Sequence, residues 1–272
     1  MTSGDTGRAG LPPSNAIRHL QTIFVLASGD LLRVVRRCSS FGVEVVEVDV
    51  DRADVALARG HGRAFVIDSA GMSSERLHRV LDAAYAHRVK VILYSNTVAD
   101  GWRRAGAARA RLLMELISAE SDPVPTMLGV LLRSAEPSLS AQCLQRIHPE
   151  VDRLDRRVVD LAIGLFAFGA LPEDVTVVAD TAGVDAKTLW RWFTSAGFRN
   201  PQSLLKIARI ARSYDLLHAG LHLDDVSGRS GFGSVDSMRR AYRTVGAASP
   251  MRAQRTVDPE EMAVLLVRAG LK

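Results

Sequence analysis

The sequence has little of several features that define large classes of protein. Its 272 residues include only two cysteines, Cys38 and Cys143, and these lack the spacing of a zinc site. Two isolated thiols do not make a disulfide framework, and they suit a reducing compartment. We therefore predict neither a metal site nor stabilisation by disulfides.

Long hydrophobic runs are also missing. The opening residues, MTSGDTGRAGLPPSNA, lack the apolar core of about 7 to 15 residues that a signal peptide needs. Rich in Gly, Ser and Pro, they predict a flexible tail over 1–19. The longest apolar stretch, 158–171, contains Asp160 and falls short of the roughly 20 residues that span a bilayer. These absences predict a cytoplasmic protein without a membrane segment.

No catalytic set is assembled in the sequence. His61, His78, His87 and His148 are scattered singly, and no Gly-rich phosphate loop follows the first apolar run, where the turn reads ASGD. We therefore expect neither enzyme activity nor a bound cofactor. An enzyme that used a crevice in the N-terminal half would rest on fold analogy alone.

Charge and length set broad limits. The net charge is +5 and the isoelectric point is near 9.6, which modestly favours a polyanionic partner. A domain usually has roughly 100 to 200 residues, so the length predicts two domains, each with its own core.

The N-terminal half alternates short apolar runs with segments of helical periodicity. We predict strands at 22–27, 43–50, 63–68, 89–95 and 112–118, and helices at 30–41, 51–59, 73–87, 98–109 and 125–133. Continuously apolar strands separated by helices favour a parallel sheet that is covered on both faces. The expected fold of residues 20–135 is therefore α/β, with a doubly wound five-stranded sheet whose ligands collect at the carboxyl ends of the strands.

Polar residues end two of these predicted strands: Asp68 ends the third and Ser95 ends the fourth. In this order the segment resembles the receiver domain of bacterial response regulators. The acid pair that the resemblance implies after the first strand is replaced by Ala27 and Ser28, Asp30 lies past the matching position, and no lysine follows the fifth strand within 118–122. Without those acids Mg²⁺ has too few oxygen ligands. We therefore expect Asp68 to remain unphosphorylated, either as a residue of a local turn or as part of a face that binds a ligand or a protein.

The C-terminal half begins with a predicted helix at 156–168. A short helix at 175–182, a turn at 183–185 and a second helix at 186–195 then form a helix-turn-helix unit. Leu189, Trp192 and Phe193 are predicted to face inward, which leaves these residues on the outer face: Lys187, Thr188, Trp190, Arg191 and Thr194. Arg191 suits a bidentate bond to guanine, and Lys187 suits a base or a phosphate. Trp190 is equally consistent with contact to a thymine methyl group and with partial burial in the core.

The pattern then repeats. After a long helix at 202–219 come a short helix at 223–230, a turn at 231–233 and a helix at 234–245. The first unit reads Leu189-x-Arg191-x-Phe193-x₃-Gly197-x₃-Pro201, and the second reads Met238-x-Arg240-x-Tyr242-x₃-Gly246-x₃-Pro250. These residues, with Gly231-Phe232 and the linker-helix Arg209, resemble the tandem helix-turn-helix domain of the AraC/XylS family. Ser227 stands where that family usually has alanine, and Met238 where it has an aromatic residue.

The resemblance implies which side chains contact DNA bases. They are Lys187, Trp190 and Arg191 in the first unit, and Val235, Asp236, Arg239 and Arg240 in the second. Asp236 must accept a bond from cytosine or orient a neighbouring arginine, because a carboxylate near phosphates is otherwise repelled. Arg243 lies one turn farther along, which suits a phosphate.

Together these patterns predict a bacterial-type transcription regulator that reads double-stranded DNA. Its parts are a tail (1–19), a receiver-like domain (20–135), a linker (136–150), the tandem DNA-binding domain (151–256) and a terminal helix without an assigned role (257–272). The first domain is expected to pair subunits as a homodimer or to sense a small-molecule or protein signal near Ser28, Asp30, Asp68 and Ser95. The rival hypothesis is a protein-interaction module whose DNA-binding surface has decayed.

Overall fold

The structure is a computed structural model that describes residues 21–27, 29–39, 43–59, 62–97, 100–101, 104, 114–119, 124–134, 136–167 and 171–272. The tail predicted for 1–19, Ser28 and most of the helix predicted for 98–109 lie outside these residues. Within them, no helix is long and apolar enough to cross a membrane.

Five parallel strands form one sheet in the order β2-β1-β3-β4-β5. The strands are β1 (Gln21–Leu26), β2 (Val43–Glu47), β3 (Gly62–Asp68), β4 (Lys90–Ser95) and β5 (Met114–Ser118). The central strands β3 and β4 are almost wholly buried because helices cover both of their faces, whereas the edge strand β2 is not. This is the doubly wound arrangement that the sequence predicts.

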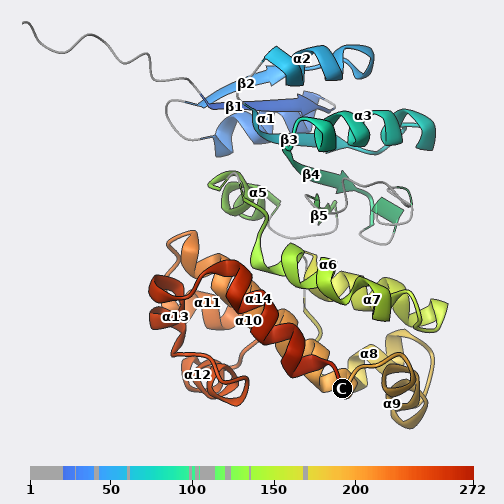
Figure 1. Ribbon diagram of the computed structural model, residues 1–272, viewed down its shortest axis with the longest axis vertical. Coiled ribbons are helices and arrows are strands. Elements are labelled where there is room, and N and C mark those ends of the chain that lie inside the picture. The colour runs from blue at the N-terminus through green and yellow to red at the C-terminus, as the bar shows by residue number, and fades with distance from the viewer. Residues whose placement is uncertain are drawn as a thin grey trace, which may run out of the picture.

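Helices flank the sheet on its two faces (Figure 1). They are α1 (Gly29–Cys38), α2 (Ala53–Arg59), α3 (Ser74–Ala86) and α5 (Val124–Leu132), with a short 3₁₀ helix at Val50–Arg52. Helix α1 packs beside α5, and α2 packs beside α3. We call the part from β1 to α5 the sheet domain.

The remaining chain is helical, and we call the part from α6 to α14 the helical domain. Its elements are α6 (Leu139–Val151), α7 (Arg156–Phe166), α8 (Val175–Thr181), α9 (Ala186–Ser195), α10 (Pro201–His218), α11 (Leu223–Arg229), α12 (Val235–Thr244), α13 (Pro250–Thr256) and α14 (Pro259–Gly270). The long helix α10 contacts every other helix of this domain, and its segment 210–217 is entirely buried. The two predicted helix-turn-helix pairs, α8–α9 and α11–α12, therefore share one central support.

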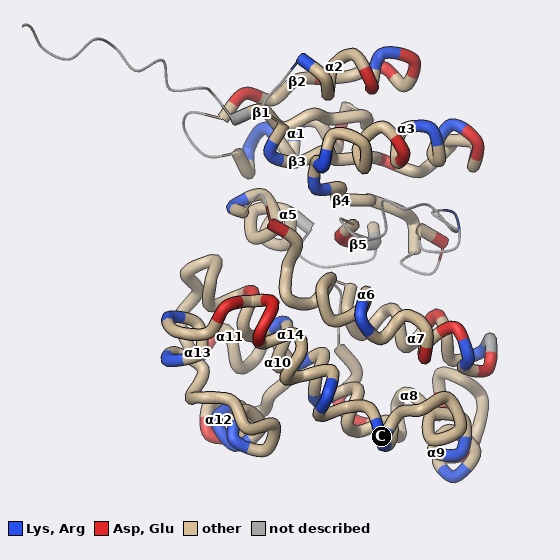
Figure 2. Tube along the Cα trace, in the orientation of Figure 1, with Lys and Arg blue, Asp and Glu red and all other residues tan. Residues whose placement is uncertain are grey.

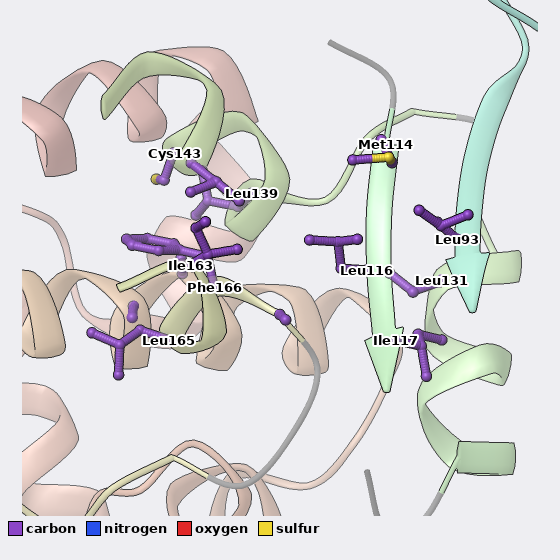
Figure 3. Packing of buried hydrophobic residues seen from close by; sticks show 14 of the residues in the cluster. Leu93, Met114, Leu116, Ile117, Leu131, Leu139, Cys143, Ile163, Leu165 and Phe166 are labelled. Atoms are coloured by element: carbon purple, nitrogen blue, oxygen red, sulfur yellow. The ribbon is translucent and has the colours of Figure 1, made fainter. Parts of the chain in front are cut away.

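The hydrophobic cores of the two domains are continuous. Figure 3 shows Leu116 of β5 directed toward Leu139 of α6 and Ile163 of α7, while Ile117 of the same strand lies on the side of Leu131. Because alternate residues of a strand point to opposite faces, β5 contributes to both cores. The sheet domain and the helical domain are thus packed against each other through the edge strand β5.

The structure differs from the sequence analysis in two helices. Residues 136–150 were predicted to be a linker, but they contain most of α6, which is capped by Ser138 and buries Leu139, Cys143 and Ile147. An apolar stripe with an N-cap is sufficient for a helix once neighbouring helices cover the stripe. Helix α13 was not predicted; it starts at Pro250, a residue that suits the first turn of a helix.

Candidate nucleic-acid interface

Helix α9 begins with a well-defined cap. The carboxylate of Asp185 accepts bonds from the backbone N–H of Thr188 at 2.8 Å and from the Thr188 hydroxyl at 2.8 Å. The bond from the Thr188 backbone is the largest cause that lowers the pKa of Asp185. Gly183, with φ 65°, makes the preceding turn in a region that L side chains rarely adopt. The hydroxyl of Thr188, predicted to contact DNA, is therefore already engaged in fixing the start of the helix.

The two faces of α9 differ sharply. Leu189 and Phe193 are buried in the core, whereas Trp190 keeps 44% of its surface exposed. Lys187 and Arg191 are exposed as well, and Thr194 is half-buried. A shallow hollow is lined by Ala186, Lys187, Trp190, Arg191 and Thr194. Four of the five side chains predicted for the first unit thus gather on one accessible surface.

Trp192 is half-buried rather than fully inward as predicted. The guanidinium of Arg157, from α7, lies 4.4 Å from the centre of its ring. This cation–π contact joins α7 to the back of α9. Arg157 was not singled out from the sequence, because its partner is distant along the chain.

Helix α12 is held by its own buried anchor. The Tyr242 hydroxyl lies 2.9 Å from the Ser213 hydroxyl of α10 and donates to the Ile210 carbonyl at 3.3 Å. Burial raises the pKa of this phenol. Together with Met238 and Ala241, Tyr242 turns the same side of the helix toward the core. The exposed side of α12 is consequently fixed relative to α10.

The outer side of α12 carries three exposed arginines: Arg239, Arg240 and Arg243. Val235 is half-buried at the start of the helix. The carboxylate of Asp236 lies 3.2 Å from an Nη atom of Arg239. Since this pair neutralises part of the face, α12 offers less free positive charge than its arginine count suggests.

Arg209 of α10 connects the two units. Its Nη2 donates to the carbonyls of Pro172, at 2.8 Å, and Glu173, at 2.5 Å, just before α8. A Cβ added to Gly231, in the turn after α11, would lie 3.1 Å from Nε of Arg209. The linker-helix arginine therefore touches the start of the first unit and the turn of the second.

Both outer faces lie at the same end of the molecule. In Figures 1 and 2, α9 and α12 occupy the end opposite β2 and α2, and Figure 2 marks Lys and Arg positions in both helices. Both helices are 10 residues long and start after a side-chain cap, Asp185 for α9 and Ser234 for α12. Repeated helices with basic faces on one end of a protein suit the major groove of DNA.

A comparison with protein families identifies this region. Residues 178–256 match the family model of a helix-turn-helix domain. The match runs from within α8 to the end of α13 and supports an AraC-type, DNA-binding transcription regulator. Helices α6, α7 and α14 lie outside the match. Comparisons with curated proteins and with solved structures found no match.

The residues of the predicted signal site are not gathered into one cluster by recorded contacts. Asp68 and Ser95 end the adjacent strands β3 and β4, and Asp68 accepts a bond from the backbone N–H of Ala70 at 2.9 Å. Ser95 is buried, and a Cβ added to Gly101 would lie 3.0 Å from its Cβ. Asp30 is exposed and pairs with Arg33 on α1, and Ser28 lies outside the described residues. No group of three or more His, Cys, Asp or Glu within the described ranges is arranged to hold a metal ion.

A buried polar network that the sequence analysis missed lies where the domains meet. Glu115 of β5 accepts bonds from the backbone N–H of Ser138 at 2.5 Å and from the Ser138 hydroxyl at 2.7 Å. Asp215 of α10 accepts bonds from the backbone N–H groups of Leu139, at 2.7 Å, and Ser140, at 3.1 Å, and from the Ser140 hydroxyl at 2.7 Å. Carboxylates from both domains thus cap the N-terminus of α6.

Lys90 of β4 completes this network. Its ammonium group donates to the carbonyls of Leu131, Ser134 and Glu136 at 2.8, 3.3 and 3.0 Å, and it lies 3.7 Å from the Glu115 carboxylate. Burial lowers the pKa of Lys90. A charged residue at the start of an otherwise apolar buried strand, KVILYS, was the signal in the sequence that could have revealed it.

Proposed function

We propose that this protein regulates transcription by inserting α9 and α12 into two successive segments of the major groove. The observation that carries the proposal is the pair of equally long, capped helices with exposed basic residues at one end of the molecule. If the helices follow one face of the duplex, their sites lie about 34 Å apart, one turn of DNA.

The two units have unequal roles in this proposal. Lys187 and Arg191 on α9 are exposed and form no ion pair within the part of the chain that the structure describes, so the proposal assigns them to bases and phosphates. On α12, Asp236 holds Arg239 at 3.2 Å, and Arg240 and Arg243 extend from the same side. The first unit therefore supplies most of the base recognition, and the second chiefly anchors the protein on the phosphates.

The sheet domain is proposed to control DNA binding without being phosphorylated. Any change at β4 or β5 reaches α6 through Lys90 and Glu115, and reaches the linker helix α10 through Asp215. Because α10 supports both helix-turn-helix pairs, the junction gives a ligand, a protein or a second subunit on the sheet domain a route to the DNA-binding surface. Phosphorylation is not the proposed signal, because Ser95 is buried and the acidic pair that would bind Mg²⁺ in a receiver domain is replaced by Ala27 and Ser28.

Fluorescence anisotropy of the full-length protein on labelled genomic fragments tests the proposal. We expect some fragments to bind at least about tenfold more tightly than a scrambled duplex, at salt concentrations that suppress non-specific binding. The variant Arg191→Ala should reduce this preference. Arg36→Ala, which removes another exposed arginine, on α1, should keep it.

Weak binding that is independent of sequence at every salt concentration would contradict the proposal. It would instead favour a protein-interaction module whose DNA-binding surface has decayed.

A further inference from the structure

Helix α14 lies outside the part that matches the helix-turn-helix family, yet it is built into the helical domain. It packs against α6 and α10 and buries Met262, Ala263, Leu266 and Gly270. At Gly270 the packing against α10 is so close that an added Cβ would lie 2.1 Å from Cδ1 of Ile207. The end of α14 is therefore held firmly on the linker helix.

The residues after α14 pair with the segment that follows α9. The backbone N–H of Arg199 donates to the Gly270 carbonyl at 2.8 Å, and the backbone N–H of Lys272 donates to the Gly197 carbonyl at 3.0 Å. Between these bonds, Phe198 and Leu271 form an antiparallel bridge. Gly197, with φ 104°, is the point at which the chain leaves α9. The C-terminal segment is thus hydrogen-bonded to the residues that directly follow α9, the first proposed recognition helix.

Two cationic side chains reinforce this contact. Nε of Arg199 donates to the Leu271 carbonyl at 2.9 Å. The ammonium group of Lys272 donates to the Thr194 carbonyl, in the last turn of α9, at 2.5 Å. A cation is favourable at that end of a helix, because the last carbonyls lack partners within the helix and carry partial negative charge.

The second unit has a looser contact with α14: a Cβ added to Gly246, in the turn after α12, would lie 4.0 Å from Cδ1 of Leu265. The only isolated bridge recorded among the described residues is that between Phe198 and Leu271, and the turn after α12 has none. Helix α12 depends instead on the buried anchor of Tyr242. A perturbation of Leu271 and Lys272 should therefore affect α9 and leave α12 in place.

We infer that residues 259–272 act as a brace that sets the orientation of α9 on DNA, with Lys272 as a positioning residue for base recognition by the first unit. The inference rests on the proposed function and assigns a role to the terminal helix. Lys272 acts through the Thr194 carbonyl and does not itself read a base.

Selection of binding sites from a randomised pool of DNA duplexes with full-length protein tests the inference. The wild type should select a motif of two parts, and Arg191→Ala identifies the part that α9 reads. Lys272→Ala should weaken the base preference of that part about fivefold or more, the loss of roughly one good base contact, and should retain the other part. Lys272→Arg should restore the preference, because it returns a donor and a positive charge.

Arg268→Ala is the matched control, since Arg268 is an exposed cation one turn earlier on α14. It should select the wild-type motif. Deletion of Leu271 and Lys272 removes the bridge together with the cation, so it should weaken the same part of the motif more strongly. Unchanged thermal melting of Lys272→Ala, followed by circular dichroism, establishes that the variant is folded.

The outcomes separate the inference from the function on which it rests. If the wild type selects no motif, the proposed function fails and the inference fails with it. If the wild type selects a motif that Lys272→Ala leaves intact, or weakens evenly over both parts, only the inference is overturned. A loss with Arg268→Ala equal to that with Lys272→Ala would also overturn it.

Discussion

Replacement of Asp215 by asparagine should change how the stability of the protein depends on pH. Asp215 is buried at the domain junction, where it accepts bonds from the backbone N–H of Leu139 and from both the backbone N–H and the hydroxyl of Ser140. Burial is the largest cause that raises the pKa of this carboxyl to about 7 from its ordinary value of 3.8, and the bonds from Ser140 and Leu139 oppose this rise. Asparagine keeps one acceptor at this place and does not titrate.

The sign of the effect follows from the raised pKa. The folded protein retains a proton on Asp215 in a pH range where the unfolded chain has already released it. The stabilisation that protonated Asp215 contributes is therefore fully present below the pKa of this group in the unfolded chain. It is lost as the pH rises through about 7. Between about pH 5 and about pH 8, the difference between the pKa of Asp215 in the folded protein and its pKa in the unfolded chain lowers the free energy of unfolding by about 2 to 3 kcal/mol.

Urea unfolding of the full-length protein at several pH values measures this effect. Most titrating groups are common to the wild type and Asp215→Asn, so the difference between their two curves reports Asp215 together with the groups coupled to it, such as Lys90. We expect the wild type to lose stability relative to the variant as the pH rises. Asp225→Asn, the same change on the exposed side of α11, should follow the wild type. Parallel curves for the wild type and Asp215→Asn would refute the role given to this carboxyl.

Three further changes test other contacts. Arg191→Ala should cost about 1 to 3 kcal/mol of binding at one base pair, whereas Arg243→Ala should weaken all duplexes alike and reduce the salt dependence; equal effects in anisotropy titrations would remove the distinction between them. Tyr242→Phe should lower the free energy of unfolding by about 1 kcal/mol, because it removes the hydroxyl bonded to α10, while DNA affinity stays nearly constant. Lys90→Met should lower the free energy of unfolding by about 3 to 5 kcal/mol, since it leaves the buried Glu115 without its cation; a loss below about 1 kcal/mol would show that the pair contributes little.

The sequence predicted those elements whose signals are local. The strands are predictable because each is a short run rich in apolar residues, although glutamates interrupt β2 and β5. Helices α9 and α12 are predictable because their buried and polar residues recur in the same order. Caps and turns at Asp185, Gly183 and Ser234 are equally local features. The match over residues 178–256 supports the same interpretation of the second half.

What the sequence did not predict depends on partners that are distant along the chain. Helix α6 contains Pro149 and several polar residues, and its N-terminus is completed by Glu115 and Asp215 from two other elements. The bridge between Phe198 and Leu271 likewise joins segments that only the folded protein brings together. The buried part of α10 contains two charged residues, Arg212 and Asp215. Their presence beside the apolar residues of this helix indicates that the helix makes polar contacts inside the protein.

The spacing of the selected DNA motif tests the central claim most directly. Binding-site selection with the full-length wild type should yield one motif with two conserved parts, whose centres lie about one helical turn, roughly 10 base pairs, apart. The part identified by Arg191→Ala should show the stronger base preference. The absence of enrichment, or a motif whose two parts do not lie on the same face of the duplex, would contradict the claim that α9 and α12 read DNA together.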